Sequence, residues 1–239
     1  MSIKENIEVI KEKMLNAVLR NGRKACEVRL LMATKTVPAN IIIEAFEAGE
    51  TLIGENKVQE LVEKADALSS WQHEAHFIGH LQSNKIKDVM KYASCIQSID
   101  RLEVAEKLEK RLLSENRVMD VFVQVNTSKE ESKFGCKEEE AVGLIEKIKE
   151  FEHLNIKGLM TIGLFSDDAN LIRPCYKMLY KIKQQVESSH LVEGKLELSM
   201  GMSGDFEIAI EEGATIIRVG TSIFGKRIYP DSYYWNEQK

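Results

Sequence analysis

Cysteine and proline are scarce in this chain, whose 239 residues include 4 cysteines and 3 prolines. The cysteines are widely separated and none belongs to a C-x-x-C pair, so we expect reduced thiols. The chain also lacks an apolar signal segment after Met1 and any apolar run of the roughly 20 residues that span a bilayer. These absences predict a cytoplasmic protein that is neither exported nor embedded in a membrane.

Basic charge is not in excess either. Lys and Arg together number 33 and Asp and Glu 38, which gives a formal net charge of −5 at pH 7. Such a chain has no basic field to attract a polyanion, so nucleic acid is not expected as a partner, although small anions can still bind locally. With 44% hydrophobic and 30% charged residues, the composition is typical of a globular protein with a sizeable core.

Short runs rich in Val, Ile, Leu and Phe recur along the chain and alternate with amphipathic stretches. The runs cover about residues 29–34, 51–54, 76–79, 94–100, 119–126, 156–162, 196–200 and 215–219. A helix over about residues 2–20 precedes them, with Ile7, Ile10, Met14, Ala17 and Val18 on one face. Regular alternation predicts an α/β fold with a parallel sheet, and eight strands in about 240 residues predict a (β/α)8 TIM barrel.

An open doubly wound sheet is the alternative architecture. It would bind its ligand at one topological switch point, whereas polar residues follow nearly every predicted strand here, which favours the barrel. No linker or low-complexity segment interrupts the series. We therefore expect a single domain over residues 1–239, with a short aromatic and polar tail from about residue 228.

Four residues predict where helices begin. Pro38 and Pro174 suit first-turn positions, where the missing N–H of proline is not needed. Asp100 and Ser203 suit N-caps, because their side-chain oxygens can accept backbone N–H bonds.

Lys35 directly follows the first predicted strand, at the edge of the sheet where βα folds place their chemistry. A lysine after a strand is commonly a solvated surface charge. The neighbours of Lys35 are uncharged, however, so its ammonium would enter a partly desolvated mouth, and desolvation lowers the pKa of a lysine and exposes its nucleophilic amine. Both interpretations stay open on the residues alone.

Two loops rich in Gly, Ser and Thr follow the last two predicted strands, at residues 199–205 and 218–222. Barrels commonly bind phosphate after strands seven and eight, where glycine lets backbone N–H groups approach an anion and hydroxyls add donors. Each loop alone could be an ordinary βα turn. Two at adjacent strand ends favour an anion site, with Ser203, Gly204, Gly220 and Thr221 as the expected contacts.

Arg218 alternates with Ile217 and Val219 and should therefore point into the barrel or its mouth. A buried arginine needs an acceptor or anionic partner. That partner could be an inward carboxylate or the ring nitrogen of a ligand, which Arg would keep unprotonated because it only donates. An amine, an arginine and a phosphate cradle together suggest pyridoxal 5′-phosphate (PLP) held as a Schiff base on Lys35.

Two other chemistries lack support in the sequence. His73, His76 and His80 would not share a face, because the segment around His76 is a predicted strand, and no carboxylate completes a metal site. No G-x-S-x-G elbow is present to build a nucleophilic serine. We therefore expect neither a metal centre nor a serine hydrolase.

Several motifs resemble the YggS/PROSC family of PLP homeostasis proteins, over about residues 5 to 227. They are ATKT (33–36), GENKVQE (54–60), HFIGHLQSNK (76–85), VN (125–126), KFG (133–135), GLMT (158–161), SMGMS (199–203) and RVGTSIFG (218–225). The resemblance implies a barrel similar to the cofactor-binding domain of alanine racemase, with the cofactor on Lys35 and Arg218 facing its ring nitrogen. It also implies that Ser203, Gly220 and Thr221 hold the phosphate and that Asn56 lies beside the cofactor. From these motifs and the two loops together, we expect the following cofactor-binding residues: Lys35, Asn56, Ser199, Ser203, Gly204, Arg218, Gly220 and Thr221.

The resemblance also bears on activity. Alanine racemase pairs its lysine with a tyrosine from a second domain, and this chain ends about where that domain would start. We therefore expect a monomeric carrier that binds, buffers and delivers PLP, with PLP-dependent apoenzymes as recipients and little amino-acid turnover. A PLP-dependent racemase of low activity and a sugar-phosphate enzyme on the same fold are the alternatives.

Overall fold

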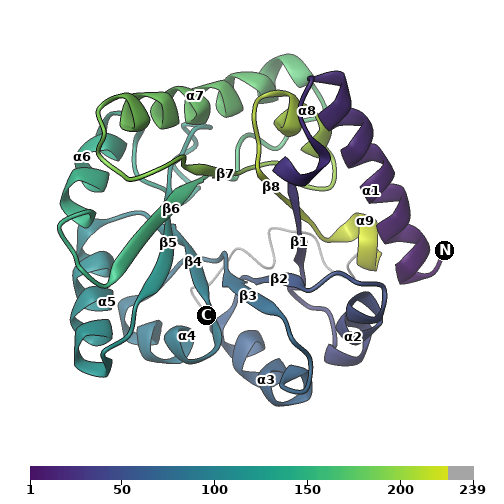
Figure 1. Cartoon of the computed structure of the whole chain (residues 1–239), viewed down its shortest axis with the longest axis horizontal. Helices are drawn as coiled ribbons and strands as arrows, with labels where there is room; N and C mark the ends of the chain where they lie inside the picture. Colours follow the sequence, from purple (N-terminus) through teal and green to yellow (C-terminus); the bar gives the residue numbers. More distant parts are fainter. Residues whose placement is uncertain (226–239) are drawn as a thin grey trace.

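The computed structural model describes residues 1–225, so the tail from about residue 228 lies outside the described part. Eight parallel strands follow one another in chain order around a closed barrel, and β8 pairs with β1 (Figure 1). The strands are β1 (Arg29–Ala33), β2 (Leu52–Glu55), β3 (Glu74–Phe77), β4 (Cys95–Ile99), β5 (Met119–Gln124), β6 (Leu154–Met160), β7 (Glu197–Ser199) and β8 (Ile216–Val219). The predicted (β/α)8 barrel is confirmed.

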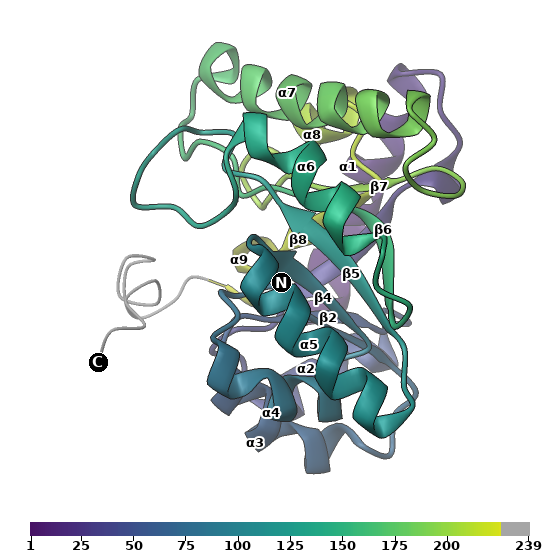
Figure 2. The same cartoon turned by 90° about the vertical axis from the view of Figure 1, so that its left-hand side faces the viewer.

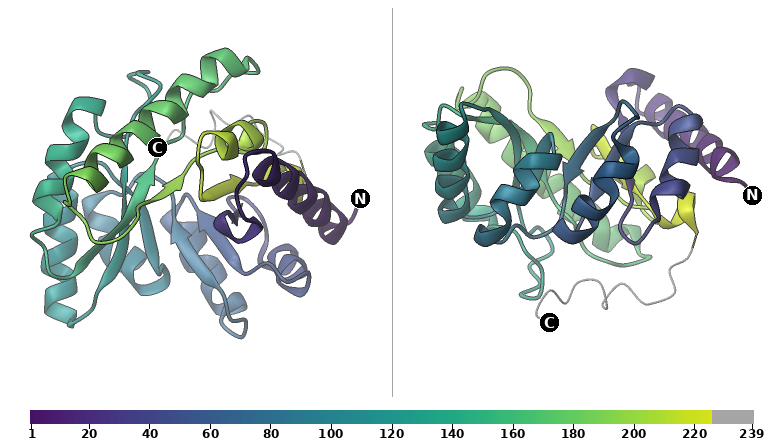
Figure 3. Two further views of the ribbon diagram at one scale, coloured as in Figure 1. Left: turned by 45° about the horizontal axis from the view of Figure 1, so that its top comes forward. Right: turned by 90° about the horizontal axis from the view of Figure 1, so that it is seen from below.

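Helices surround this barrel on the outside (Figure 2). They are α1 (Ile3–Arg20), α2 (Ala39–Glu47), α3 (Val58–Leu68), α4 (Ile86–Tyr92), α5 (Leu102–Glu115), α6 (Glu138–Ile148), α7 (Ala169–Ser188), α8 (Phe206–Glu211) and α9 (Thr221–Phe224). Two 3₁₀ turns, η1 (Ala25–Glu27) and η2 (Ser83–Lys85), precede β1 and α4. Figure 3 shows α1, in purple, along the outside of the barrel beside the yellow-green α8, which it contacts.

The α1 helix begins with a capping box, in which Ser2 and Glu5 exchange hydrogen bonds between side chain and backbone. Its buried residues are the five predicted for its apolar face: Ile7, Ile10, Met14, Ala17 and Val18. Burial of this stripe is what holds an otherwise polar helix on the barrel.

Buried apolar side chains form two separate clusters, one inside the barrel and one between the sheet and the helices. On β1, Leu31 and Ala33 belong to a small cluster inside the barrel, whereas Leu30 and Met32 pack in the layer between sheet and helices. The inner cluster has only eight buried members, and buried polar side chains share the interior with it: His76, Gln97, Gln124, Ser199 and Arg218. Because an interior that served only for packing would be apolar, these polar side chains indicate a functional role for the barrel interior.

None of the four predicted helix starts is exact: those at Pro38 and Asp100 are displaced by one residue, and those at Pro174 and Ser203 by more. Pro174 lies inside α7, because Asp168 accepts the Asn170 N–H at 2.8 Å and so begins the helix further upstream. Pro38 lies one residue before the first turn of α2, at its N-cap.

Asp100 and Ser203 are not N-caps. The residue before α5 is Arg101 and the residue before α8 is Asp205. Each predicted capping oxygen is used elsewhere: the Asp100 carboxylate binds the Arg101 guanidinium, and the Ser203 hydroxyl accepts N–H groups from the β8–α9 turn.

Gly79 generates a first prediction, because a Cβ at this position would lie 1.8 Å from the carbonyl oxygen of Asn56. Backbone cannot yield as a flexible side chain can, so Gly79→Ala should lower the free energy of unfolding by about 3 kcal/mol or more. The control is Gly143→Ala in α6, where the new Cβ meets no atom within 4 Å and should stabilise by roughly 0.5–1 kcal/mol. Equal denaturant midpoints for the two variants would contradict this contact.

Candidate functional site

Lys35 lies at the mouth of the barrel, half-buried in the turn that follows β1. Its position follows from the end of β1 at Ala33, since the side chains of Leu31 and Ala33 lie inside the barrel. On the neighbouring strand β8, Arg218 pairs with Leu31. The turn that carries Lys35 therefore follows the strand next to that of Arg218.

The turn after Lys35 holds a strained residue. Thr36 has φ of +66°, a left-handed conformation that is costly for a β-branched residue. Its backbone N–H donates to Glu60 Oε2 at 2.5 Å. A short bond to a carboxylate from α3 thus holds the turn that carries Lys35 in one conformation.

A buried ion pair lies beneath the same turn. Glu55 Oε1 accepts from Thr34 Oγ1 and from Lys64 Nζ, both at 2.7 Å. The same Lys64 ammonium donates to the Thr34 carbonyl and to Glu60, each at 2.9 Å. Burial raises the pKa of Glu55 above its ordinary value, and the Lys64 charge opposes this rise.

Glu55 bonds to Lys64 of α3, so its side chain faces the helices and supports the Lys35 turn from behind. Asn56 lies half-buried just after β2, and its carbonyl fills the space that Gly79 leaves open. The strand ends carrying Lys35, Asn56 and Gly79 are thus neighbours at the mouth.

Arg218 points into the barrel, as predicted, and is 5% exposed. Its Nη1 donates to Ser199 Oγ at 2.9 Å and its Nη2 to the Thr161 carbonyl at 2.7 Å. Within residues 1–225 no carboxylate forms an ion pair with it; burial lowers the pKa of its guanidinium, and the nearby Tyr176 and Asp205 oppose this. The alternative of a direct structural ion pair is therefore wrong, and a buried cation whose hydrogen-bond partners are neutral suits a ligand acceptor.

The loops after β7 and β8 meet at Ser203. Its hydroxyl accepts the backbone N–H of Gly220 at 3.3 Å and that of Ser222 at 3.4 Å. These bonds are long, so both N–H groups remain available to a stronger acceptor such as a phosphate oxygen. Gly204 and Thr221 are exposed beside them, and a Cβ at Gly204 would meet nothing within 4 Å. This convergence fits the phosphate end of PLP.

A buried tyrosine fixes the first of these loops. Tyr176 of α7 donates its hydroxyl to Asp205 Oδ2 at 2.6 Å, and the other carboxylate oxygen accepts the Met202 N–H at 2.6 Å. Burial, with the nearby Asp205 charge, raises the pKa of Tyr176 well above its ordinary value, so the phenol stays a donor. The loop that presents Ser203 is held at both ends.

The opposite side of the mouth is lined by an aromatic pair. The rings of His80 and Phe134 stack with centroids 3.8 Å apart and planes at 15°. Burial lowers the pKa of His80, and the Asp100 carboxylate 3.7 Å away opposes this. Asn126, just after β5, organises the Phe134 loop by donating to the carbonyls of Glu130 and Lys133.

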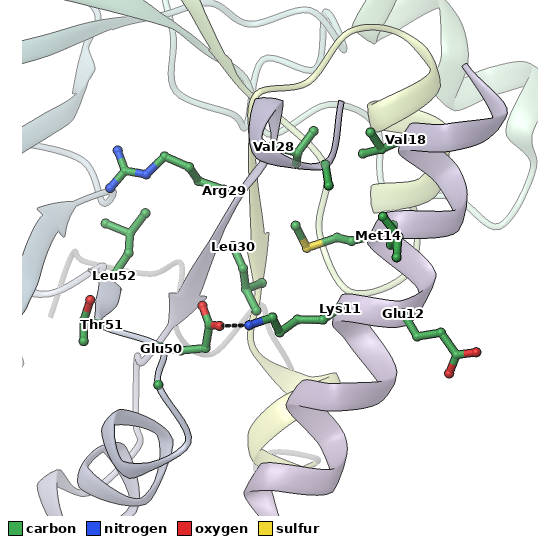
Figure 4. Close-up of a pocket in the computed structure, with 13 residues that line it drawn as sticks. Lys11, Glu12, Met14, Val18, Val28, Arg29, Leu30, Glu50, Thr51 and Leu52 are labelled. Carbon is green, nitrogen blue, oxygen red and sulfur yellow. Dashed lines mark hydrogen bonds and ion pairs between the residues drawn. The ribbon is translucent and has the colours of Figure 1, made fainter. Parts of the chain in front are cut away.

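A pocket of about 600 Å³ lies at the other end of the strands (Figure 4). It is bounded by α1, by the start of β1 at Arg29 and by the turn before β2, and Lys11 bonds to Glu50 across it at 2.7 Å. Barrels place their chemistry at the carboxyl ends of the strands, so this pocket is not the candidate site.

The three histidines do not converge on a metal. His73 stacks on Phe46, His76 is buried in the barrel and His80 is at the mouth. Across the described part of the chain, no group of three or more His, Cys, Asp or Glu residues could hold a metal ion. No helix in residues 1–225 is long and apolar enough to cross a bilayer.

Sequence reasoning missed several residues that support the site. Lys64 and Tyr176 act through contacts between elements distant in the chain, and Gln97 and His76 lie behind Arg218 in the barrel interior. The inward period of β3 and β4 could have indicated His76 and Gln97 as buried polar residues, but nothing local pairs them.

The chain is similar to known proteins over nearly its whole length. The family model described as "Alanine racemase, N-terminal domain" matches residues 2–228. A curated relative from Aquifex aeolicus, named "Pyridoxal phosphate homeostasis protein", is 40% identical over 229 residues, which are 96% of this chain and 100% of that protein.

Solved structures extend the likeness. PipY of Synechococcus elongatus, solved with PLP bound, has a TM-score of 0.81 at 29% identity and covers 94% of this chain and 100% of that one. Alanine racemase of Clostridium difficile has a TM-score of 0.74 at 13% identity, covering 96% of this chain and 58% of that one, which establishes the fold alone.

The Glu55–Lys64 pair generates a second prediction. Lys64→Met leaves a buried carboxylate unpaired, so it should lower the free energy of unfolding by about 3–5 kcal/mol at neutral pH. The folded-state pKa of Glu55 lies above its unfolded value, so its contribution to stability is present at low pH and is lost as pH rises through the folded-state pKa. The deficit of the variant should therefore shrink as the pH is lowered toward the ordinary range of a glutamate.

Denaturant titrations at several pH values measure this. Lys107→Met, which breaks the exposed pair with Glu103, is the control and should cost less than about 1 kcal/mol. Adding Glu55→Gln to Lys64→Met should recover part of the loss, because it removes the stranded charge. A deficit that does not change with pH would count against the buried carboxylate as its cause.

Proposed function

The chain belongs to the alanine racemase N-terminal domain family and, within it, to the PLP homeostasis (YggS/PROSC) proteins, and from that premise we propose that it binds PLP and carries it for intracellular vitamin B6 homeostasis. The observation that carries the proposal is the convergence of three groups at one barrel mouth: the Lys35 turn, the buried Arg218 and the Ser203 loop. An amine, an unneutralised guanidinium and backbone donors match the aldehyde, ring nitrogen and phosphate of PLP.

The proposed roles follow from these contacts. Lys35 forms a Schiff base with the PLP aldehyde, and Arg218 donates to the ring nitrogen. The donors for the phosphate are Ser203, Gly204, Gly220 and Thr221, while Ser199 orients Arg218 and Asn56 borders the cofactor. When bound, PLP supplies an electrophilic carbon and a ring that can accept electron density.

A carrier suits this site better than a fast enzyme does. Because Arg218 can only donate, it holds the ring nitrogen unprotonated, and an unprotonated ring accepts electron density poorly. The curated relatives from Aquifex aeolicus and Homo sapiens are likewise named as homeostasis proteins rather than as catalysts. The site is thus suited to retaining and releasing PLP rather than to the turnover of amino acids. We further propose that the protein is a cytoplasmic monomer and that it delivers PLP to PLP-dependent apoenzymes.

Lys35 generates the third prediction. The protein saturated with PLP should be yellow, and borohydride should bleach it and leave one reduced label on Lys35, located by mass spectrometry. Lys35→Ala and Lys35→Arg should both fold yet lack the visible band, because neither retains the amine that condenses with the aldehyde. Lys133→Ala, at another mouth loop, is the control and should keep the band and the label.

Each alternative outcome has a distinct meaning. A colourless protein that binds a sugar phosphate would support the unrelated enzyme on the same fold instead. A label on another lysine would overturn the assignment of Lys35 alone. Loss of folded structure in Lys35→Arg would mean that the amine is structural.

A racemase of low activity is the second candidate, favoured by the likeness of the barrel to alanine racemase and by the amine of Lys35 at its mouth. Incubation of the loaded protein with single amino acids in deuterium oxide tests it, with exchange of the α-proton followed by NMR. For a carrier we expect exchange far slower than the several turnovers per second of an ordinary enzyme. Exchange at that rate would overturn the carrier proposal.

A further inference from the structure

A continuous chain of hydrogen bonds runs through the barrel interior behind Arg218. Arg218 Nη1 donates to Ser199 Oγ at 2.9 Å, and Ser199 Oγ donates to Gln97 Oε1 at 2.6 Å. Gln97 Nε2 then meets His76 Nδ1 at 2.7 Å. Four strands, β8, β7, β4 and β3, thus contribute one member each.

The far end of this chain reaches the opposite end of the barrel. His76 Nε2 lies 3.6 Å from Glu74 Oε2, and the same oxygen accepts from Arg29 Nη2 at 2.6 Å. Ser199 and Gln97 are fully buried, whereas the Glu74 side chain is 54% exposed. We call the hydrogen-bonded chain Arg218–Ser199–Gln97–His76 the relay. It extends from the buried guanidinium at the mouth to within 3.6 Å of the Glu74–Arg29 pair at the amino ends of the strands.

The chemistry of the donors fixes the direction of every proton. Arg218 can only donate, so the Ser199 oxygen accepts from it and the Ser199 proton goes to Gln97 Oε1. This orients the amide so that its NH₂ group faces His76, whose Nδ1 must then accept. His76 is consequently neutral and carries its proton on Nε2, toward Glu74.

A charged His76 would break this order. Its Nδ1–H would require the Gln97 amide to turn and present NH₂ to Ser199, whose hydroxyl proton would then lack its acceptor. The groups around the ring favour the neutral state: burial lowers the pKa of His76 to about 4, with Glu74 and Asp120 opposing and Arg29 assisting. The relay is consistent only with one tautomer.

The geometry points to Gln97 and His76 as positioning residues that hold the guanidinium of Arg218 in the orientation that meets the PLP ring. The inference rests on the proposed function only for the identity of the ligand. Without a carboxylate partner, Arg218 depends on Ser199 and the Thr161 carbonyl for its orientation, and Ser199 depends on Gln97. Neither Gln97 nor His76 is among the residues proposed to contact PLP.

Gln97→Met tests the relay, because it keeps the length of the side chain and removes both hydrogen-bonding groups. In the protein without PLP, nitrogen-15 NMR of the His76 ring should show the Nε2–H tautomer alone in the wild type and a mixture in the variant. The dissociation constant for PLP should rise about fivefold, the effect of one lost hydrogen bond, and the visible band should shift.

Ser98→Ala is the matched control, because Ser98 is the next residue of β4, is buried and has no hydrogen-bond partner for its hydroxyl among the described residues. It should leave the tautomer, the affinity and the band unchanged. Gln97→Glu should restore the affinity, because a carboxylate still accepts from Ser199, while His76 becomes protonated and its pKa rises. Rescue of this kind would not follow from a packing role.

The outcomes separate the two proposals. If Gln97→Met matches Ser98→Ala in affinity and tautomer, the relay is overturned while the carrier stands. If the wild type does not bind PLP at all, the carrier proposal is overturned, and the tautomer in the unloaded protein still decides the relay. Should Gln97→Met not fold, Ser199→Ala against Ser199→Thr, which keeps the hydroxyl, gives the same comparison.

Discussion

The buried positive charge of Arg218 is the constraint around which the barrel interior is arranged. A guanidinium removed from water and given only neutral acceptors carries a desolvation cost that nothing on its own strand offsets. Polar side chains from other strands, Ser199 and Gln97 among them, supply hydrogen bonds in this interior. Aliphatic layers commonly fill the same space in barrels of this kind. A site that tolerates this cost is built to receive an acceptor.

The turn that carries Lys35 is stabilised by a different kind of interaction. Here the charge that stabilises the turn lies outside the barrel wall, where Lys64 joins Glu55 and Glu60 and holds Thr36 in its left-handed conformation. Strain of this kind persists only when the surrounding contacts over-determine it. The amine is thus presented by a rigid turn, while the network that holds the turn stays clear of the space above it.

The sequence was sufficient for the architecture because alternation along each strand and along α1 is a local property. Periodicity alone predicted the buried face of α1, from Ile7 to Val18, and the inward direction of the Arg218 side chain. Helix starts were less predictable, since the oxygen of Ser203 is bound by a turn 17 residues away in the chain and not by its own helix. The partners of Gln97 and Tyr176 had no local signal, because each residue acquires its role from a group more than 20 residues away in the chain.

The contrast in exposure between Arg218 and the loop tips at Gly204 and Thr221 has an electrostatic consequence. Counterions screen charges at the protein surface over roughly 10 Å at ordinary ionic strength, but they reach a buried group far less. The two ends of an elongated anion in this mouth therefore experience different media. Added salt would weaken the contacts of the anion with the exposed loop tips, while its contact with the buried Arg218 would change little. Dissociation of the anion would therefore begin at the loop tips.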